Sequence, residues 1–184
     1  MKARALILAA SFLFAEGFLF AQENETKERI RYSNITEFGF ITASPQGISL
    51  EATTVHGFSI EKQHFFGLGM GFGVNFHNQG RYYRTNDAMI YMPVFFNYRL
   101  CFKPNKTFSP HVNIAIGGIA VEDGAGVYSV FTMGFKARAF SFSSGFSFMP
   151  FRITYKSSGY FVDDDSFSEW YSPFGVALKF GFSF

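Results

Sequence analysis

Several features that would point to a soluble fold or to a familiar chemistry are scarce in this chain. Cys101 is the single cysteine, so there is no disulfide framework, and it lies too far from the N-terminus to be a lipoprotein anchor. Charged residues make up 16% of the 184 residues, against about 25% in a typical soluble domain. Beyond residues 1–21, no apolar run approaches the ~20 residues that a membrane-spanning helix needs. These shortages exclude a disulfide-stapled scaffold and favour strands over membrane-spanning helices in the rest of the chain.

The usual motifs of catalysis and cofactor binding are also missing. The sequence contains no glycine-rich phosphate loop, no zinc-ligand spacing and no pair of catalytic carboxylates. The formal net charge of +2 is too small to indicate a nucleic acid or another polyanion as partner. We therefore expect no cofactor, no metal ion and no nucleic-acid partner.

Aromatic residues, in contrast, are abundant and alternate with small ones. The chain contains 28 Phe and 9 Tyr, and aromatic residues account for 21% of the sequence. In the last stretch, every even position from Phe174 to Phe184 is large and apolar, and every odd position is small or polar. A period of two is the pattern of a β-strand whose two faces meet different surroundings.

The limits of this pattern divide the chain into three parts. Residues 1–21 have the positive start, the apolar stretch and the final small residue, Ala21, of a secretory signal; cleavage after Ala15 and an uncleaved anchor helix are alternatives. Residues 22–31 are polar, charged and without periodicity, so we expect a flexible mature N-terminus. Residues 32–184 keep a high aromatic and β-branched content without a linker, which predicts one domain.

Eight strand-like segments are separated by turn signals within this domain. They cover about residues 32–43, 48–60, 66–76, 88–102, 108–121, 127–137, 139–155 and 170–184. The connections alternate between short turns, at 61–63, 103–107 and 137–139, and two longer polar loops, at 78–87 and 157–169. An even-stranded barrel with short turns at one end and long loops at the other has this asymmetry.

Two prolines predict local irregularities. Pro93 falls inside the fourth strand, where proline removes a ladder hydrogen bond, so we expect a bulge or a distortion there. After Pro150 the apolar residues change from even positions, such as Phe148, to odd positions, such as Phe151. A β-bulge produces such a change of face, so we expect a second bulge at Pro150.

The choice of the outer face rests on volume. The interior of an eight-stranded barrel is only just filled by side chains, so the Phe, Leu and Met face would overfill it. The opposite face, rich in Gly, Ser, Ala, Asn and Thr with a few charges, fits inside. Turned toward lipid, the apolar face meets hydrocarbon, and closure of the sheet satisfies every backbone polar group. We predict an all-β fold, a closed antiparallel up-and-down transmembrane β-barrel of eight strands; a soluble lipid-binding barrel is the alternative.

Charged residues of both signs fall on inward positions of this barrel. They are Glu37, Glu51, Arg99, Lys136, Arg138 and Lys179. Buried charges are tolerated when they are paired and hydrogen-bonded, and both signs are available here. We hypothesise an interior salt-bridge network that plugs the lumen. The alternative is that these residues fill the barrel and have no role in transport.

Three loop features are candidates for other functions. His77 and Asp87, at either end of the loop 78–87, are the one pair that suggests catalysis, although nothing supplies a nucleophile. The Asp163-Asp164-Asp165 run, with Glu169 after it, lacks the spacing of a calcium loop and is expected to be a solvated loop tip. Aromatic residues expected to form a girdle at the membrane rim are Tyr82, Tyr83, Tyr160, Trp170 and Tyr171. Tyr82 and Tyr83 lie between two arginines, so binding of lipopolysaccharide phosphates is their alternative role.

Three features of the chain together resemble a known protein family. The signal-like start, the glycine-alternating strand from Phe66 to Phe76 and the ending from Gly175 to Phe184 resemble the small outer-membrane β-barrel family of OmpA/OmpX-like porin-fold proteins. In that family a terminal aromatic residue, preceded by alternating aromatic residues, is the signal that the barrel-assembly machinery reads. The positions of this chain that match the signal are Phe180, Phe182 and Phe184.

The resemblance implies where the protein is located and what it contacts, but it does not imply one activity. It implies the outer membrane of a Gram-negative bacterium after cleavage of the signal, contact with outer-membrane lipid and lipopolysaccharide, insertion by the barrel-assembly machinery, and a monomer. Activities in the family range from adhesion and envelope stability to small-solute passage and lipid modification, and the fold does not choose among them. We expect a non-enzymatic barrel with a structural or surface-interaction role. A narrow small-solute channel and an outer-membrane lipid-modifying enzyme are the alternatives.

Overall fold

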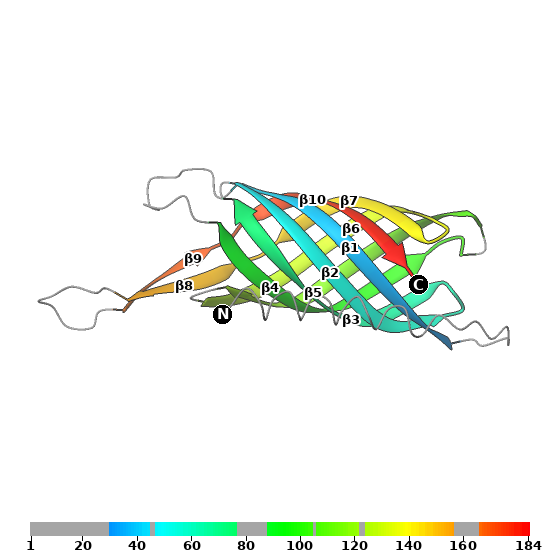
Figure 1. Cartoon of the computed structure of the whole chain (residues 1–184), viewed down its shortest axis with the longest axis horizontal. Helices are drawn as coiled ribbons and strands as arrows, with labels where there is room; N and C mark the ends of the chain where they lie inside the picture. The colour runs from blue at the N-terminus through cyan, green and yellow to red at the C-terminus, as the bar shows by residue number, and fades with distance from the viewer. Residues whose placement is uncertain (1–29, 45–46, 77–87, 105, 122–123, 157–165) are drawn as a thin grey trace, which may run out of the picture.

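The computed structural model of the chain describes residues 30–44, 47–76, 88–104, 106–121, 124–156 and 166–184. These residues form ten β-strands (Figure 1). The strands are β1 (Ile30–Ser44), β2 (Gly47–Ile60), β3 (His64–Phe76), β4 (Met89–Cys101), β5 (Phe108–Val121), β6 (Gly124–Ala137), β7 (Phe140–Phe148), β8 (Phe151–Lys156), β9 (Ser166–Tyr171) and β10 (Phe174–Ser183). None of the described residues belongs to a helix long and apolar enough to cross a membrane.

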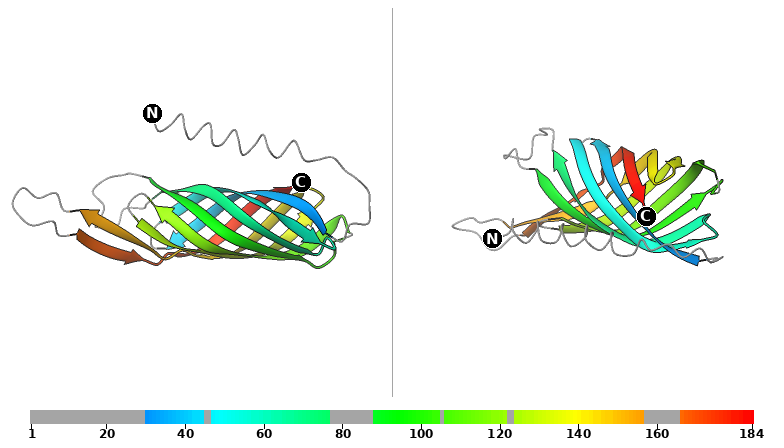
Figure 2. Two further views of the ribbon diagram at one scale, coloured as in Figure 1. Left: turned by 90° about the horizontal axis from the view of Figure 1, so that it is seen from below. Right: turned by 45° about the vertical axis from the view of Figure 1, so that its right-hand side comes forward.

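Eight of the strands close into one antiparallel ring. β1 to β6 pair in chain order, β6 pairs with β7, β7 with β10, and β10 returns to β1. Following the paired residues once around the ring from Ser33 leads back to β1 at Ala43, ten residues further along the strand. This stagger tilts the strands relative to the barrel axis, as Figure 2 shows. The predicted fold, a closed eight-stranded up-and-down barrel, is confirmed.

The two ends of the barrel are distinguished by their connections. At one end, β2 and β3 are joined by a tight turn in which the Gln63 amide donates to the Ile60 carbonyl at 3.0 Å. Glu61 and Lys62 adopt positive φ angles of 52° and 59°, as the turns that match the twist of a hairpin require. We call this the turn end. The opposite end, where β3 stops at Phe76, is the loop end.

Large apolar side chains cover the outward face of the ring. Burial alternates residue by residue along the strands, and in β3 the even positions from Phe66 to Met70 are exposed while their odd neighbours are buried. Leu68 is 71% exposed, the highest fraction among the large apolar residues described. Other exposed residues of this face include Phe38, Leu50, Phe72, Val94, Phe96, Ile116, Met133, Phe146 and Phe180. The predicted orientation, with the Phe-rich face outward, is confirmed.

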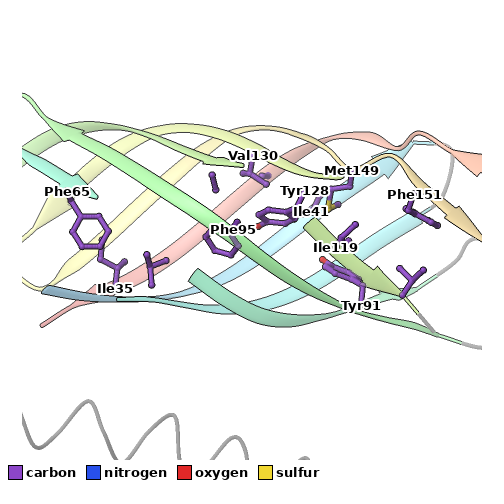
Figure 3. Close-up of a cluster of buried hydrophobic side chains, with 14 residues drawn as sticks. Ile35, Ile41, Phe65, Tyr91, Phe95, Ile119, Tyr128, Val130, Met149 and Phe151 are labelled. Atoms are coloured by element: carbon purple, nitrogen blue, oxygen red, sulfur yellow. The ribbon is translucent and has the colours of Figure 1, made fainter. Parts of the chain in front are cut away.

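The inward face is not made of small residues alone, as the volume argument assumed. The buried cluster in Figure 3 includes large aromatic side chains, among them Phe95 and Tyr91 of β4. They lie against glycines of β3: a Cβ atom added to Gly69 would collide with the Phe95 ring, and one added to Gly73 would collide with the Tyr91 ring. The glycine ladder of β3 therefore provides the space in which the aromatic rings of β4 pack.

Pro93 distorts the sheet without shifting its register. Pairing of β3 with β4 is interrupted between Met70–Val94 and Gly73–Tyr91, and it resumes in the same register. On its other side, β4 pairs with β5 without interruption, and Pro93 lies opposite Ile119. Of the two expectations at Pro93, the distortion is found and a bulge is not.

The bulge predicted at Pro150 is wrong. From Phe148 to Phe151 the chain advances three residues while the paired residues on β6 also change by three, from Ser129 to Gly126, so no extra residue is inserted. On the other side, β7 pairs with β10 and β8 pairs with β9. There too the change from Phe148 to Phe151 is matched by a change of three residues, from Phe174 to Tyr171. The apolar residues change face because Phe151 is buried inside the barrel mouth, whereas Arg152 is exposed on the outward side. β8 and β9 thus continue the β7–β10 hairpin beyond the ring, where they project at one end in Figures 1 and 2.

The packing of Phe95 on Gly69 predicts a large effect for a small substitution. Gly69→Ala is expected to destabilise the barrel by about 1–3 kcal/mol, because the added methyl group overpacks the interior. Urea unfolding of the refolded protein, followed by the shift between folded and unfolded gel bands, measures the change.

Gly118→Ala is the matched control. It lies on the outward face of β5, and the nearest atom to its added Cβ is the Gly126 carbonyl oxygen at 3.9 Å. It is expected to be neutral or slightly stabilising, since alanine restricts the unfolded chain more than glycine does. Equal stability of the two variants would contradict the packing of Phe95 on Gly69.

Candidate functional site

The charged residues inside the ring form one network from four strands. Glu37 of β1, Glu51 of β2, Arg99 of β4 and Lys179 of β10 all occupy buried, inward positions. Gly39 is paired with Glu51 on one side and with Lys179 on the other. Because glycine has no side chain, Glu51 and Lys179 can meet across β1.

The network contains three ion pairs. Lys179 Nζ lies 2.9 Å from Glu51 Oε1 and 3.9 Å from Glu37 Oε2. Arg99 forms an ion pair with the other oxygen of Glu37 and donates from Nε to Asn113 Oδ1 at 3.3 Å. The side chains of all four charged residues are between 1% and 4% exposed. Each acid therefore has a base beside it, as buried charges require.

Two tyrosines complete the coordination of Glu51. The hydroxyl of Tyr128 donates to Glu51 Oε1 at 2.8 Å, and that of Tyr91 donates to Oε2 at 3.3 Å. Lys179 Nζ in turn donates to the Tyr128 hydroxyl oxygen at 3.1 Å. Both carboxylate oxygens are thus hydrogen-bonded, and the aromatic rings of the tyrosines join the charged layer to the apolar cluster of Figure 3. Hydrogen bonds to charged groups are stronger than neutral ones, and these link β2, β4, β6 and β10 across the lumen.

Of the six predicted interior charges, four belong to this network and two do not. Lys136 lies on an inward position of β6 near the turn end, but it forms no ion pair with any described residue. Arg138 is wrong as an interior residue. It is exposed in the turn between β6 and β7, where its φ angle is 57°. The alternation that predicted an inward Arg138 does not extend into a turn, since the chain reverses there.

The sequence interpretation missed Tyr91, Tyr128 and Asn113. Tyr91 lies between Ile90 and Met92, which alternation places outward, so its inward position could have been found. Its contact with Glu51 could not, because the two residues are 40 positions apart and meet only across the lumen.

The proposed C-terminal signal residues lie on the outward face at the turn end. The ring of Phe180 is 5.0 Å from that of Phe142, and the ring of Phe182 is 4.8 Å from that of Phe140. Phe184 is 61% exposed, and its backbone exchanges hydrogen bonds of 2.9 and 3.0 Å with Asn34 of β1. These residues therefore help to close the ring; their reading by assembly machinery stays a prediction.

Most of the remaining candidates fall outside the described residues. This applies to Tyr82, Tyr83, Tyr160, His77, Asp87 and the run from Asp163 to Asp165, and to the side chains of Glu169 and Tyr171. Trp170 is described in β9, beyond the ring, and is 68% exposed. Within the described part of the chain, no three His, Cys, Asp or Glu residues lie close enough together to hold a metal ion.

Comparisons with known proteins yield structural likenesses alone. No family model and no curated protein sequence matches the chain. The chain is similar in structure to the N-terminal β-barrel domain of Pseudomonas aeruginosa OprF, with 11% identity and a TM-score of 0.45 over 83% of this chain and 97% of that one. It is similar to Neisserial surface protein A, with 8% identity and a TM-score of 0.44 over 85% and 98% of the two chains.

A third likeness is to a major outer membrane protein from Thermus thermophilus, with 9% identity and a TM-score of 0.39 over 84% of this chain and all 100% of that one. At these values the likenesses concern the fold and carry no residue roles. The assignment of the fold rests on the strand pairing described above.

Breaking the buried network is expected to destabilise the barrel strongly. Lys179→Met leaves Glu51 without its base and Glu37 with one base in place of two, and loss of one partner of a buried pair costs about 3–5 kcal/mol. Urea unfolding in lipid vesicles measures the loss. Lys103→Met, at an exposed turn position, is the control and is expected to leave the midpoint unchanged. A Lys179→Met barrel as stable as this control would show that the network contributes little.

Proposed function

We propose that the chain is an integral outer-membrane β-barrel protein with a structural or surface-interaction role and a lumen closed by its buried charges. The observation that carries this proposal is the combination of an apolar outward face around a closed ring with a fully paired layer of charges inside it. The role is non-enzymatic in this proposal. The chain is delivered by residues 1–21 as a cleaved signal and works as a monomer in contact with outer-membrane lipid and lipopolysaccharide.

The dimensions and the outer surface support insertion in a bilayer. Strands of 13 and 14 residues, such as β3 and β5, exceed the ~9–11 tilted residues that cross the hydrocarbon core. Monomeric soluble proteins rarely expose contiguous apolar surface beyond a few hundred Å². On β7 and β8 the outward residues change from Phe148 to Arg152 where the ring ends. A soluble lipid-binding barrel would need the opposite orientation, with its apolar face around a cavity.

Heat-modifiability of the extracted protein tests the membrane proposal. We expect the protein in the outer-membrane fraction, and we expect its gel mobility after detergent extraction to change when the sample is boiled, because folded barrels resist the detergent of the gel. A soluble fraction holding the protein, or one mobility before and after boiling, would count against the proposal.

The network of Glu37, Glu51, Arg99 and Lys179 supports a closed lumen. These side chains and the tyrosines bound to Glu51 extend from strands on several sides of a narrow ring, and an eight-stranded ring is only just filled by side chains. We expect no stable open channels when the purified protein is inserted in planar bilayers. Stable openings would overturn the closed lumen and favour a narrow small-solute channel.

Insertion by the barrel-assembly machinery rests on the C-terminal aromatic residues. We expect deletion of Phe184 to lower the amount of folded protein in cells, measured as the heat-modifiable fraction, because the terminal aromatic residue is proposed to be part of the recognised signal. Phe146→Ala is the control, since Phe146 is also an outward phenylalanine but lies far from the C-terminus. Equal losses in the two variants would remove the special role of Phe184.

A further inference from the structure

Buried polar groups without hydrogen-bond partners among the described residues occur along the lumen, and several of them lie near its turn end. Arg99 lies two residues before the end of β4, His111 three residues after the start of β5, and Lys136 one residue before the end of β6. Within the described part of the chain, Arg99 Nη1 and both ring nitrogens of His111 are buried without a hydrogen-bond partner. Arg99 is 2% exposed and His111 is 1% exposed, so bulk solvent does not reach these two side chains freely.

The register brings these three side chains together. Arg99 is paired with Asn113 and Lys136 with Ser109, and these two β5 residues flank His111 on the same face of the strand. Each base is thus one diagonal step from His111, roughly 7–8 Å between backbones, which long side chains span. His111 lies within electrostatic range of Arg99, of the Glu37 carboxylate that Arg99 binds, and of Lys136.

The charge count leaves this region positive. Glu37 and Glu51 are engaged by Arg99 and Lys179, and Lys136 forms no ion pair with the other described residues. Arg31, an exposed residue at the start of β1, also lies within electrostatic range of Lys136 and adds a further positive charge. A positive charge enclosed by protein is costly unless an opposite charge accompanies it.

We propose that the turn end of the lumen binds a small inorganic anion between Arg99, His111 and Lys136. Arg99 Nη1 and the Lys136 ammonium group supply charge-assisted donors, which are the strong ones for an anion, and a ring N–H of His111 lies between them as a neutral donor. The hydroxyl of Ser109, buried and likewise without a partner among the described residues, adds a neutral donor. Chloride, a small anion without bonded substituents, is the expected ligand.

The site lies on the turn side of the charged layer, so its anion enters from that end. Lys136 is only half-buried, and its strand ends at the next residue. The anion therefore need not cross the layer of Glu37, Glu51, Arg99 and Lys179. The site is independent of whether the barrel conducts, because a closed or an open layer leaves it accessible from the turn end.

Salt-dependent unfolding of the folded full-length barrel tests the site. Urea unfolding in vesicles is compared in sodium chloride, sodium bromide, sodium phosphate and sodium gluconate at one ionic strength, with gluconate as an anion too large to enter. We expect chloride and bromide to shift the folding equilibrium toward the barrel, by about tenfold when the anion is present at ten times its Kd. A shift with phosphate alone supports the site, as one for an oxyanion, where Lys136→Gln removes it; a phosphate shift that the variant retains is the general stabilising effect of this salt and overturns the proposal. Identical unfolding in all four salts overturns the proposal.

Two variants and a control locate the effect. Lys136→Gln and His111→Gln are each expected to reduce the chloride shift, whereas Lys103→Gln, in an exposed turn, is expected to retain it. A shift that survives both luminal substitutions overturns the assignment to these residues. If the variants do not fold, anomalous scattering from bromide-soaked crystals of the unaltered protein decides. A bromide peak beside Arg99 and His111 supports the site, and its absence there overturns the proposal.

Discussion

Closure of the sheet between β1 and β10 is the constraint on which the rest of the structure depends. Once these strands pair, the backbone groups of the ring find partners within the sheet and no edge strand remains in it. Closure with eight strands also limits the interior to a narrow space that side chains must fill. The outward face is left to meet whatever surrounds the barrel, and along this ring that face is apolar.

The filling of the interior follows from its limited width. Aromatic rings of β4 reach inward because glycines of β3 leave space for them, as Gly69 does for Phe95. The charges are accepted because each acid of the layer has a base and hydrogen-bond donors within reach, as Glu51 has Lys179 and two tyrosine hydroxyls. Toward the turn end the composition changes, and Lys136, which forms no ion pair with the other described residues, leaves an excess of positive charge beside Arg99 and His111. The lumen thus contains an apolar cluster, a layer of paired charges and a positively charged turn end. The cluster needs space for its rings, the layer needs opposite charges side by side, and the turn end needs an accompanying negative charge.

The prediction at Pro150 failed for an instructive reason. The change of apolar residues from Phe148 to Phe151 was interpreted as an inserted residue, yet the register is unbroken on both sides of the hairpin. The pattern changed because the surroundings of the strand change where the ring ends, so that Arg152 faces outward and Phe151 is buried. A reversal of alternation therefore has two physical causes, a bulge and a change of environment, and pairing partners are needed to tell them apart.

The sequence alone determined the eight strands of the ring, their two faces and the closed all-β fold, because a period of two and the turn residues are local properties. It assigned residues 166–169, where β9 begins, to a loop. It also identified four of the members of the buried network, Glu37, Glu51, Arg99 and Lys179, since alternation assigns a face to each residue of a strand. It could not supply Tyr91, Tyr128 and Asn113 as their partners, nor exclude Arg138. Which inward side chains meet depends on the ten-residue stagger of the ring. The stagger results from the pairing of all eight strands together, which no single segment of the sequence specifies. The contacts between inward side chains were therefore decided only by the tertiary structure.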